Sequence, residues 1–360
     1  MTEKLKIGII SLGSKSSEML IDECKHFFDE VAHLDLRKIE IKIDKKTEVL
    51  YDGEPLKEYD CLLMKGSFRY ANLLYGLSEA YNDKCFLPID SNAHIIAHNK
   101  FMTHLILAEN KLIKMPATYF AAKVSETKQF LKTLNYPIVL KFPNGTHGKG
   151  VIFSESYASA SSMIDALDVF KQPALIQDYI PVKSDIRIIV AGDKIIGSMK
   201  RIAKGEEIRA NAHLGGDAVP YVVTTEIKVM ALEAARKIKA GICAIDIIES
   251  DYGPQLLEVN TSPGLQKITE VTKKNIAYEM AEYLFNETRK FKGDKNKIYN
   301  KDMMQGLKVT EIGSRDFEAE VTVRNNRIIL PEFVHLMSNI QNGEIVTIKI
   351  SKNKVEIIRQ

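Results

Sequence analysis

The chain has 360 residues, of which 45% are hydrophobic and 27% are charged, with 50 Lys+Arg against 47 Asp+Glu. This length predicts two or three domains, and the average composition excludes disordered, collagen-like and coiled-coil proteins. The net charge of +3 is too small to indicate a nucleic-acid-binding protein by itself.

The sequence also bears on the cellular compartment. No apolar run approaches the ~20 residues that span a bilayer, and the N-terminus lacks the pattern of a signal peptide. The four cysteines, Cys24, Cys61, Cys85 and Cys243, are widely spaced and form no CxxC pair. These features predict a cytoplasmic protein with reduced thiols, without a membrane anchor, a disulfide framework or a zinc site.

Residues 1–90 alternate between strand and helix patterns and predict an open α/β domain. The strands are expected at 5–10, 31–35, 39–43 and 59–64, and the helices at 19–28 and 70–82. The turn at Gly13 is not a dinucleotide-binding loop, because the second and third glycines of GxGxxG are absent.

Residues 91–290 predict a second, larger domain. A long helix capped at Asp90 is expected to run to about residue 113. Residues 115–183 form a predicted small lid subdomain, with strands at 117–121, 138–142, 151–153 and 174–179 and helices at 126–134 and 156–170. Residues 184–290 form a predicted, mostly β catalytic subdomain, with helices at 225–239 and 276–286.

The C-terminal part predicts a separate module. Residues 291–305 are rich in lysine and predict a solvated basic linker. Residues 306–360 alternate between apolar and polar side chains. They predict a small β-rich domain with a short helix from Pro331.

A glycine-rich loop follows the strand that ends in Lys141. Residues 143–150 read PNGTHGKG, with Gly145, Gly148 and Gly150, and a second strand follows. Bare backbone amides in such a hairpin can approach phosphates, and Lys141 adds a positive charge at its base. His147 is a further candidate for phosphate contact. The alternative is an ordinary surface hairpin.

Two later strands carry oxygen ligands within apolar runs. Asp246 interrupts one run, and Glu258 and Asn260 lie two apart on the next, so that they share a face. Buried polar groups cost stability unless they are compensated, and hard oxygen ligands suit Mg²⁺ rather than zinc. The pattern favours a magnesium site, with a hydrogen-bonded structural cluster as the alternative.

Cations gather between these two regions. Asp185 and Arg187 share one strand face, Arg201 follows on the next strand, and Arg209 and Asn211 precede a Gly-Gly turn. They indicate a clamp on an anionic ligand. Solvated strand faces are the alternative.

The ordered series of Lys141, GTHGKGV, QDYI, DIR, KR, RANAHLGG, AIDII and LLEVNTSPGL resembles the ATP-grasp superfamily. Within it the series resembles the RimK-type α-L-glutamate ligases, over about residues 1–290. The resemblance implies an ATP-grasp fold preceded by the open α/β domain. It also implies an ATP-dependent carboxylate–amine ligase that forms an amide through an acyl phosphate.

The resemblance implies a role for each matching residue. Catalytic roles would fall to Lys141, Arg187, Arg201, Arg209 and Asn211. ATP would be bound by Lys100, Lys141, Gly145, Thr146, Gly148, Gly150, Gln177, Asp178, Tyr179, Ile180, Asp185, Arg209, Ala210 and Asn211. Two Mg²⁺ ions, or Mn²⁺, would be held by Asp246, Glu258 and Asn260, and Ser262 and Gly264 would shape the acceptor end.

The resemblance is less specific for the substrates. It implies L-glutamate or another amino acid, added to an acidic acceptor such as a protein C-terminus or a coenzyme. A same-mechanism ligase of coenzyme, lysine or arginine biosynthesis, acting on a carrier protein, is an alternative. The family's basic positions near the substrate read His213-Leu214 and Met64-Lys65-Gly66-Ser67 here, and these departures concern the acceptor.

Residues 321–346 resemble a swapped-hairpin AbrB-type module. Such modules dimerise and often bind DNA, which implies a homo-oligomer, a dimer or a tetramer. A nucleotide-sensing DNA-binding regulator is therefore the alternative from another functional class, with DNA as a less favoured partner. His94 and His98 are four apart without the glutamate of a metalloprotease motif, so they are expected to pack along their helix.

Overall fold

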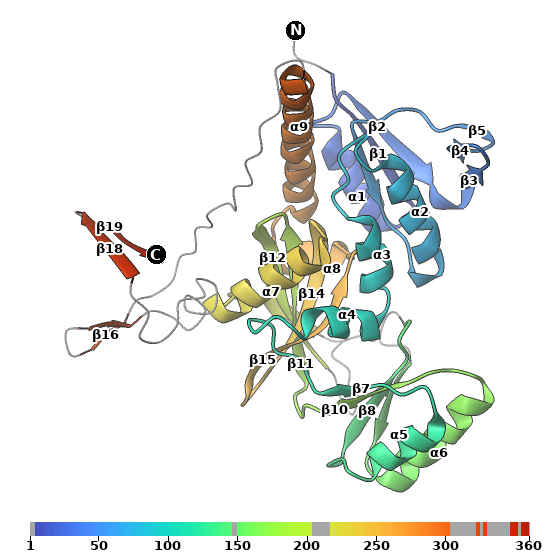
Figure 1. The fold of residues 1–360 in the computed structure, drawn as a ribbon, viewed down its shortest axis with the longest axis vertical. Coiled ribbons are helices and arrows are strands. Elements are labelled where there is room, and N and C mark those ends of the chain that lie inside the picture. Colours follow the sequence, from blue (N-terminus) through green and yellow to red (C-terminus); the bar gives the residue numbers. More distant parts are fainter. Residues whose placement is uncertain are drawn as a thin grey trace. The chain divides into compact units, whose positions relative to one another are not determined.

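The computed structural model describes residues 4–145, 150–203 and 217–302, and beyond them 322–324, 327–329, 346–351 and 354–359. The chain divides into two compact units, Met1–Lys308 and Val309–Gln360. Helices and several sheets alternate along the first unit (Figure 1), which confirms the predicted mixed α/β class. The boundaries predicted within this unit, near residues 90 and 183, stay predictions.

The N-terminal part is built on a parallel sheet of order β2-β1-β6, as its alternating pattern predicts. The three strands are β1 (Lys6–Ser11), β2 (Glu30–Asp35) and β6 (Cys61–Met64). Every residue of β6 is buried, which is typical of parallel strands covered on both faces. An antiparallel sheet of β3 (Ile39–Ile43), β4 (Thr47–Tyr51) and β5 (Glu54–Pro55) follows.

Two helices accompany these sheets, α1 (Lys15–Cys24) and α2 (Ala71–Tyr81). The first begins four residues earlier than predicted, because Ser14 caps it: the Ser14 side chain accepts a hydrogen bond from the Ser17 amide at 3.3 Å. All four cysteines are free and buried.

The single long helix predicted between Asp90 and residue 113 is wrong. The structure has two helices, α3 (Ser91–Ala97) and α4 (Lys100–Leu107). Asn99 separates them, because its backbone is extended and its side chain accepts a hydrogen bond from the Met102 amide at 3.2 Å. The break places Lys100 at the start of α4.

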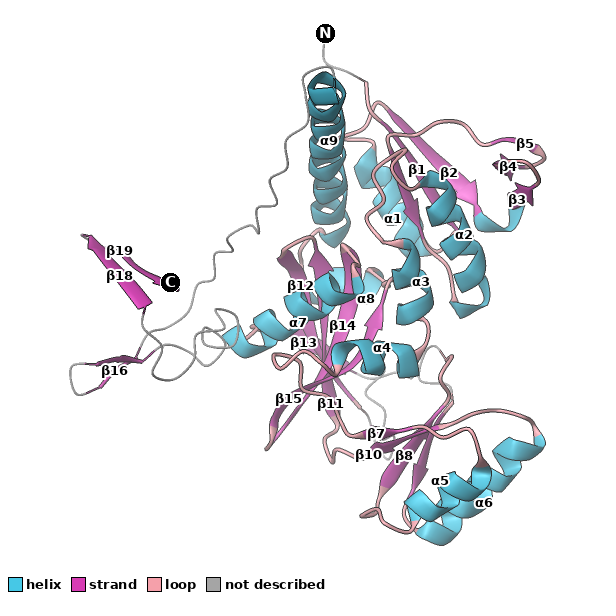
Figure 2. Ribbon diagram, viewed as in Figure 1, coloured by secondary structure: helices cyan, strands magenta, loops and turns pink. Residues whose placement is uncertain are grey.

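A small antiparallel sheet of order β7-β10-β8-β9 follows. Its strands are β7 (Thr118–Tyr119), β8 (Ile138–Lys141), β9 (Val151–Ser154) and β10 (Leu175–Asp178). The helices α5 (Val124–Leu131) and α6 (Tyr157–Val169) pack beside one another next to this sheet (Figure 2). Leu131, Ile138 and Leu140 are completely buried in the core that these helices form with the sheet.

The central sheet has five antiparallel strands in the order β13-β12-β11-β14-β15. Their bounds are β11 (Ser184–Ala191), β12 (Lys194–Ile202), β13 (Asp217–Pro220), β14 (Ile242–Ser250) and β15 (Gly253–Asn260). The helices α7 (Thr225–Ile238) and α8 (Gln266–Thr272) contact it. Alternation along β11 turns Ile186 and Ile188 into the core and leaves Arg187 on the opposite face.

The last helix of the first unit, α9 (Ile276–Asp302), is longer than predicted. The helix extends into the segment 291–305 as far as Asp302, and the role of this segment as a linker stays a prediction. No proline interrupts the segment, Glu287 and Lys290 pair one turn apart, and Lys292 Nζ lies 2.7 Å from Asp60. Among the helices in the described ranges, none combines the length and apolar character needed to cross a membrane.

In the second unit the described residues form two antiparallel hairpins. Strand β16 (Thr322–Arg324) pairs with β17 (Arg327–Ile329), and β18 (Val346–Ser351) pairs with β19 (Lys354–Arg359). They agree with the predicted β-rich character. The helix predicted from Pro331 lies outside the described residues, and the AbrB-like assignment stays a prediction.

Candidate active site

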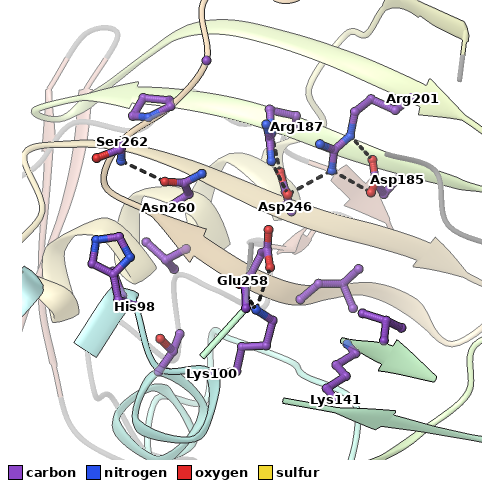
Figure 3. Close-up of a pocket in the computed structure, with 18 of the residues that line it drawn as sticks. His98, Lys100, Lys141, Asp185, Arg187, Arg201, Asp246, Glu258, Asn260 and Ser262 are labelled. Atoms are coloured by element: carbon purple, nitrogen blue, oxygen red, sulfur yellow. Dashed lines mark hydrogen bonds and ion pairs between the residues drawn. The ribbon is translucent and has the colours of Figure 1, made fainter. Parts of the chain in front are cut away.

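A cavity of about 580 Å³ lies where the small sheet, the five-stranded sheet and the N-terminal part of the first unit meet. Figure 3 shows its centre, where carboxylates and cations from several elements point toward one another. Of the predicted site residues, those that line it are Lys100, Lys141, Gly145, Gln177, Asp178, Tyr179, Ile180, Asp185, Arg187, Arg201, Asp246, Glu258, Asn260, Ser262 and Gly264.

A buried network of two carboxylates and two guanidinium groups lies at the floor of the cavity. Arg187 donates to Asp246 at 2.8 and 2.6 Å, in the fork geometry that suits a carboxylate. Arg201 donates to Asp185 at 2.5 and 2.7 Å and lies 2.9 Å from Asp246 (Figure 3). The strand register explains the network, because Asp185 is opposite Arg201 and Arg187 is opposite Asp246.

These contacts keep Asp246 ionised. Burial alone would raise the pKa of Asp246, but the charges of Arg187 and Arg201 outweigh it and hold the pKa below its usual range. The Asp246 side chain is only 5% exposed and that of Arg201 only 4%. Breaking such a buried network is expected to be costly, because it leaves a charge without a partner.

Glu258 is more open than Asp246. It is opposite Asp246 across β14 and β15, and its side chain is 38% exposed. Its carboxylate lies 3.5 Å from Lys100 Nζ, which also donates to the Gly145 carbonyl at 2.9 Å. The side-chain oxygen of Asn260 accepts from the Ser262 amide at 2.8 Å. Glu258 is thus held loosely, by one cation.

The donor set of Asp246, Glu258 and Asn260 fits Mg²⁺. All three side chains line one cavity, and carboxylate and amide oxygens are the ligands this ion prefers. The described part of the chain contains no cluster of three or more acidic, histidine or cysteine side chains that could hold a metal alone. An ion here would therefore also depend on oxygens from its ligand, as magnesium with nucleotide phosphates does.

A chain of hydrogen bonds fixes Lys141 at the other side of the cavity. Lys141 donates to the side-chain oxygen of Gln177, whose amide group donates to Thr118 Oγ1 at 2.9 Å. Thr118 Oγ1 lies 3.1 Å from His104 Nδ1, and His104 Nε2 lies 3.3 Å from the Leu257 carbonyl. Burial lowers the pKa of His104 to about 4, so the ring is neutral at pH 7 and bonds as donor at Nε2 and acceptor at Nδ1.

Only one of the two described ends of the glycine-rich loop lines the cavity. Gly145 lines the cavity, whereas Gly150 is not among the lining residues and has a φ of +79°. A Cβ on Gly150 would come within 2.4 Å of the Phe142 ring, so both the backbone and the space require glycine. Thr146, Gly148, Arg209, Ala210 and Asn211, together with His147, lie outside the described residues.

One side of the cavity was predicted only at Lys65-Gly66-Ser67, through the resemblance; its serines from β1 and α1 were not predicted. Its lining comes from the loops after β1 and β6 and from the start of α1, and includes Ser11, Ser14, Ser16, Lys65 and Ser67. A lysine directly after an entirely apolar strand was the signal available. His98 is a second correction: it ends α3 and lines the cavity, whereas His94 is buried as predicted.

The family model of the RimK-like ATP-grasp domain matches residues 97–284, which is more than half of the chain. The chain belongs to the RimK-like ATP-grasp family. The matched residues of this family member include α4, the small sheet and the five-stranded sheet, which together supply the floor and one side of the cavity.

Similarity to other proteins extends over more of the chain than the residues that the family model matches. This RimK-like chain is 32% identical over 286 residues to a probable α-L-glutamate ligase of Vibrio cholerae serotype O1, covering 78% of the chain and 95% of that relative. It is 32% identical over 288 residues to a protein of the same name from Pseudoalteromonas translucida, with the same coverage.

Solved structures share the ATP-grasp fold at low identity. The ATP-grasp ligase PsnB with a minimal precursor superimposes with a TM-score of 0.63 at 12% identity, over 79% of this chain and 99% of that one. The D-alanine–D-alanine ligase of Bacillus anthracis with ATP gives 0.59 at 16% identity, over 82% and 100%. The fold predicted for the first unit is thereby confirmed.

Proposed function

We propose that this protein is an ATP- and Mg²⁺-dependent ligase that joins a carboxylate to an amine. The observation that carries the proposal is that Lys100, Lys141 and Arg187 line one cavity together with the loosely held Glu258. Such a site can neutralise phosphates and a substrate carboxylate together. Family membership and the ligase names of the relatives support the same reaction class.

In this proposal the nucleotide lies against the small sheet. Asp178, Tyr179 and Ile180 line the cavity where β10 ends, and Tyr179 packs edge-on against Phe153, a wall suited to a flat base and its ribose. Lys100 and Lys141 would contact the phosphates. In the same proposal Thr146, Gly148 and Gly150 belong to a loop over the phosphates, and Arg209, Ala210 and Asn211 contact the transferred phosphoryl group.

Asp246, Glu258 and Asn260 would hold the magnesium, proposed as two ions with Mn²⁺ as a substitute. Bound there, the metal supplies positive charge to the phosphate oxygens. Glu258 can exchange Lys100 for the ion, because a separation of 3.5 Å is a weak contact. Arg187 and Arg201 hold Asp246 in place and ionised.

The proposed chemistry needs no protein nucleophile. A carboxylate oxygen of one substrate attacks the γ-phosphorus of ATP, the bond to ADP breaks, and an acyl phosphate forms. The amine then attacks the acyl carbon, phosphate leaves, and the amine loses a proton. Two anions meet in the first step, so the cations of the cavity provide much of the catalysis by charge neutralisation.

For the substrates we propose L-glutamate, or another amino acid, as the amine and an acidic acceptor such as a protein C-terminus or a coenzyme. The names of the relatives support L-glutamate. A ligase of the same mechanism that acts on a carrier protein is the second candidate, because the basic segment at Lys65 departs from the family pattern on the acceptor side. The alternative from another functional class, a nucleotide-sensing DNA-binding regulator, would show no turnover of ATP.

The test supplies purified protein with ATP, Mg²⁺, each of the twenty amino acids and candidate acceptors, and measures ADP release and the intact mass of the acceptor. Glutamate-sized mass increments are the expected result. Absence of ADP release with every combination would count against the ligase.

The pH dependence of ATP binding tests whether the charged Lys141 side chain contacts the phosphates. Burial lowers the pKa of Lys141 to about 8, so its charge is present at pH 7 and is lost as the pH rises through 8. Since phosphate binds the charged form, the Kd for ATP is expected to be about tenfold higher at pH 9 than at pH 7. Calorimetric titration at both pH values measures it.

The matched variant for this test is Lys141→Arg, which stays charged at both pH values. Its Kd for ATP should change little between pH 7 and pH 9. An equally steep dependence in the variant would assign the titration to another group.

For residues 309–360 we propose the AbrB-like role of holding two copies of the chain together. The alternating hairpins β16–β17 and β18–β19 support it. Deletion of residues 309–360, a separate compact unit, is expected to lower the oligomeric state and to leave the ligase active. Light scattering during size-exclusion chromatography measures the mass, and an unchanged oligomer would refute the dimerisation role.

A further inference from the structure

Lys65 stands apart from the other cations of the cavity. Among the described lining residues, Lys100, Lys141, Arg187 and Arg201 each have a polar partner. The side chain of Lys65 is buried, with the residue 5% exposed, and its ammonium has no hydrogen-bond partner in the described part of the chain. A buried charge without a partner costs stability, and an anion bound beside it would offset that cost.

The position of Lys65 in the fold is that of a ligand site. It directly follows β6, and its amide donates to the Ile10 carbonyl at 2.8 Å. In the sheet order β2-β1-β6 the chain leaves β1 to one side for β2 and returns on the other side as β6. Ligands of open α/β sheets bind at the carboxyl ends of the strands, at such a reversal.

The surroundings of Lys65 suit a carboxylate. The other lining residues from the same loops and from β1 and the start of α1 are Ser11, Leu12, Ser14, Ser16, Ser17, Gly66 and Ser67, none of which is acidic. The acidic lining residues in the described ranges come instead from the other elements: Asp178, Asp185, Asp246 and Glu258. The side at Lys65 therefore carries a positive charge and, among the described lining residues, no acidic side chain.

Hydrogen bonds tie this side to the end of β15. Ser262 Oγ accepts from the Gly66 amide at 3.1 Å and donates to the Gly66 carbonyl at 3.0 Å. Ser262 is two residues after Asn260 and bonded to it at 2.8 Å. An anion at Lys65 would thus lie on the part of the cavity that is bonded to the end of β15, near Asn260.

We propose that Lys65 binds a carboxylate of the substrate that is not the one activated by ATP. The inference rests on the proposed ligase and adds to it a residue that recognises one of its substrates. The carboxylate belongs either to the incoming amino acid or to the acceptor. The flexible four-carbon side chain of Lys65 lets its ammonium reach the ligand.

The test compares Lys65→Met with Lys65→Arg and with Lys25→Met, whose lysine is exposed at the end of α1 and pairs with Asp22. Calorimetry measures the affinity of the full-length, ADP-bound proteins for L-glutamate and for a peptide that ends in glutamate. Lys65→Met is expected to weaken the binding of one probe by about tenfold or more. The probe that loses affinity identifies the source of the carboxylate. Lys65→Arg and Lys25→Met are expected to bind as the wild type does.

A second readout separates ligand binding from a structural role. Because Lys65→Met removes a buried charge without a partner, it should melt at the same temperature as the wild type or higher. A lower melting temperature or failure to fold would mean that Lys65 neutralises a carboxylate of this chain. That outcome overturns the proposal, as would unchanged affinity for both probes or a wild type that binds neither.

The outcome is distinguishable from failure of the ligase. Release of ADP by the wild type with unchanged affinities of Lys65→Met would leave the ligase standing without this subsite. Binding of L-glutamate through Lys65 without any ADP release would support the subsite and contradict the ligase.

Discussion

The substitution Glu258→Gln is expected to lower kcat by at least about 10³-fold, because it removes the charged oxygens proposed to hold the metal at the phosphates. Folding should be unaffected, since the Glu258 side chain is 38% exposed and has a single ion-pair partner at 3.5 Å. Steady-state ADP release measures kcat, and thermal melting measures stability.

The matched control is Glu270→Gln. Glu270 is also a glutamate paired with a lysine, Lys267 at 3.1 Å, but it lies on the exposed face of α8. Its removal should leave turnover unchanged. Persisting activity of Glu258→Gln at the level of this control would refute the metal assignment.

The second large effect concerns stability. Arg201→Met is expected to reduce the free energy of unfolding by about 3–5 kcal/mol, because it leaves the buried carboxylate of Asp185 without its bidentate partner. Arg201 is the buried link of the network, bonded to both Asp185 and Asp246. Chemical denaturation followed by circular dichroism measures the loss.

Two further variants test the reason for this loss. Arg37→Met breaks a bidentate pair with Asp35 that is exposed, and it should be nearly neutral. The double variant Arg201→Met with Asp185→Leu should recover much of the stability, because neither charge is then left alone. A loss in Arg201→Met no larger than in Arg37→Met would mean that the buried network contributes little.

Much of the fold could be predicted because the apolar pattern is regular. The runs that became β1, β6 and β14 are almost entirely apolar, and their burial follows from the sequence. The predictions were wrong where a single side-chain contact decides whether a helix ends or continues. Asn99 ends one helix by capping the next, and α9 continues through lysines that find partners such as Asp60.

The candidate site could be predicted in part. Spacing alone placed Glu258 and Asn260 on one strand face, and both line the cavity with Asp246. The contribution of the N-terminal part could not be predicted in this way, because it depends on tertiary contacts between residues far apart in sequence. The bonds between Gly66 and Ser262 span 196 positions, and no local pattern records them.

The central claim is that the carboxylate is activated as an acyl phosphate, and isotope transfer tests it most directly. The acceptor is labelled with ¹⁸O in its carboxylate, incubated with the enzyme, ATP, Mg²⁺ and L-glutamate, and the phosphate released is analysed by mass. The account predicts one ¹⁸O in the inorganic phosphate for each amide formed, with ADP as the other product. Unlabelled phosphate, or AMP in place of ADP, would contradict it.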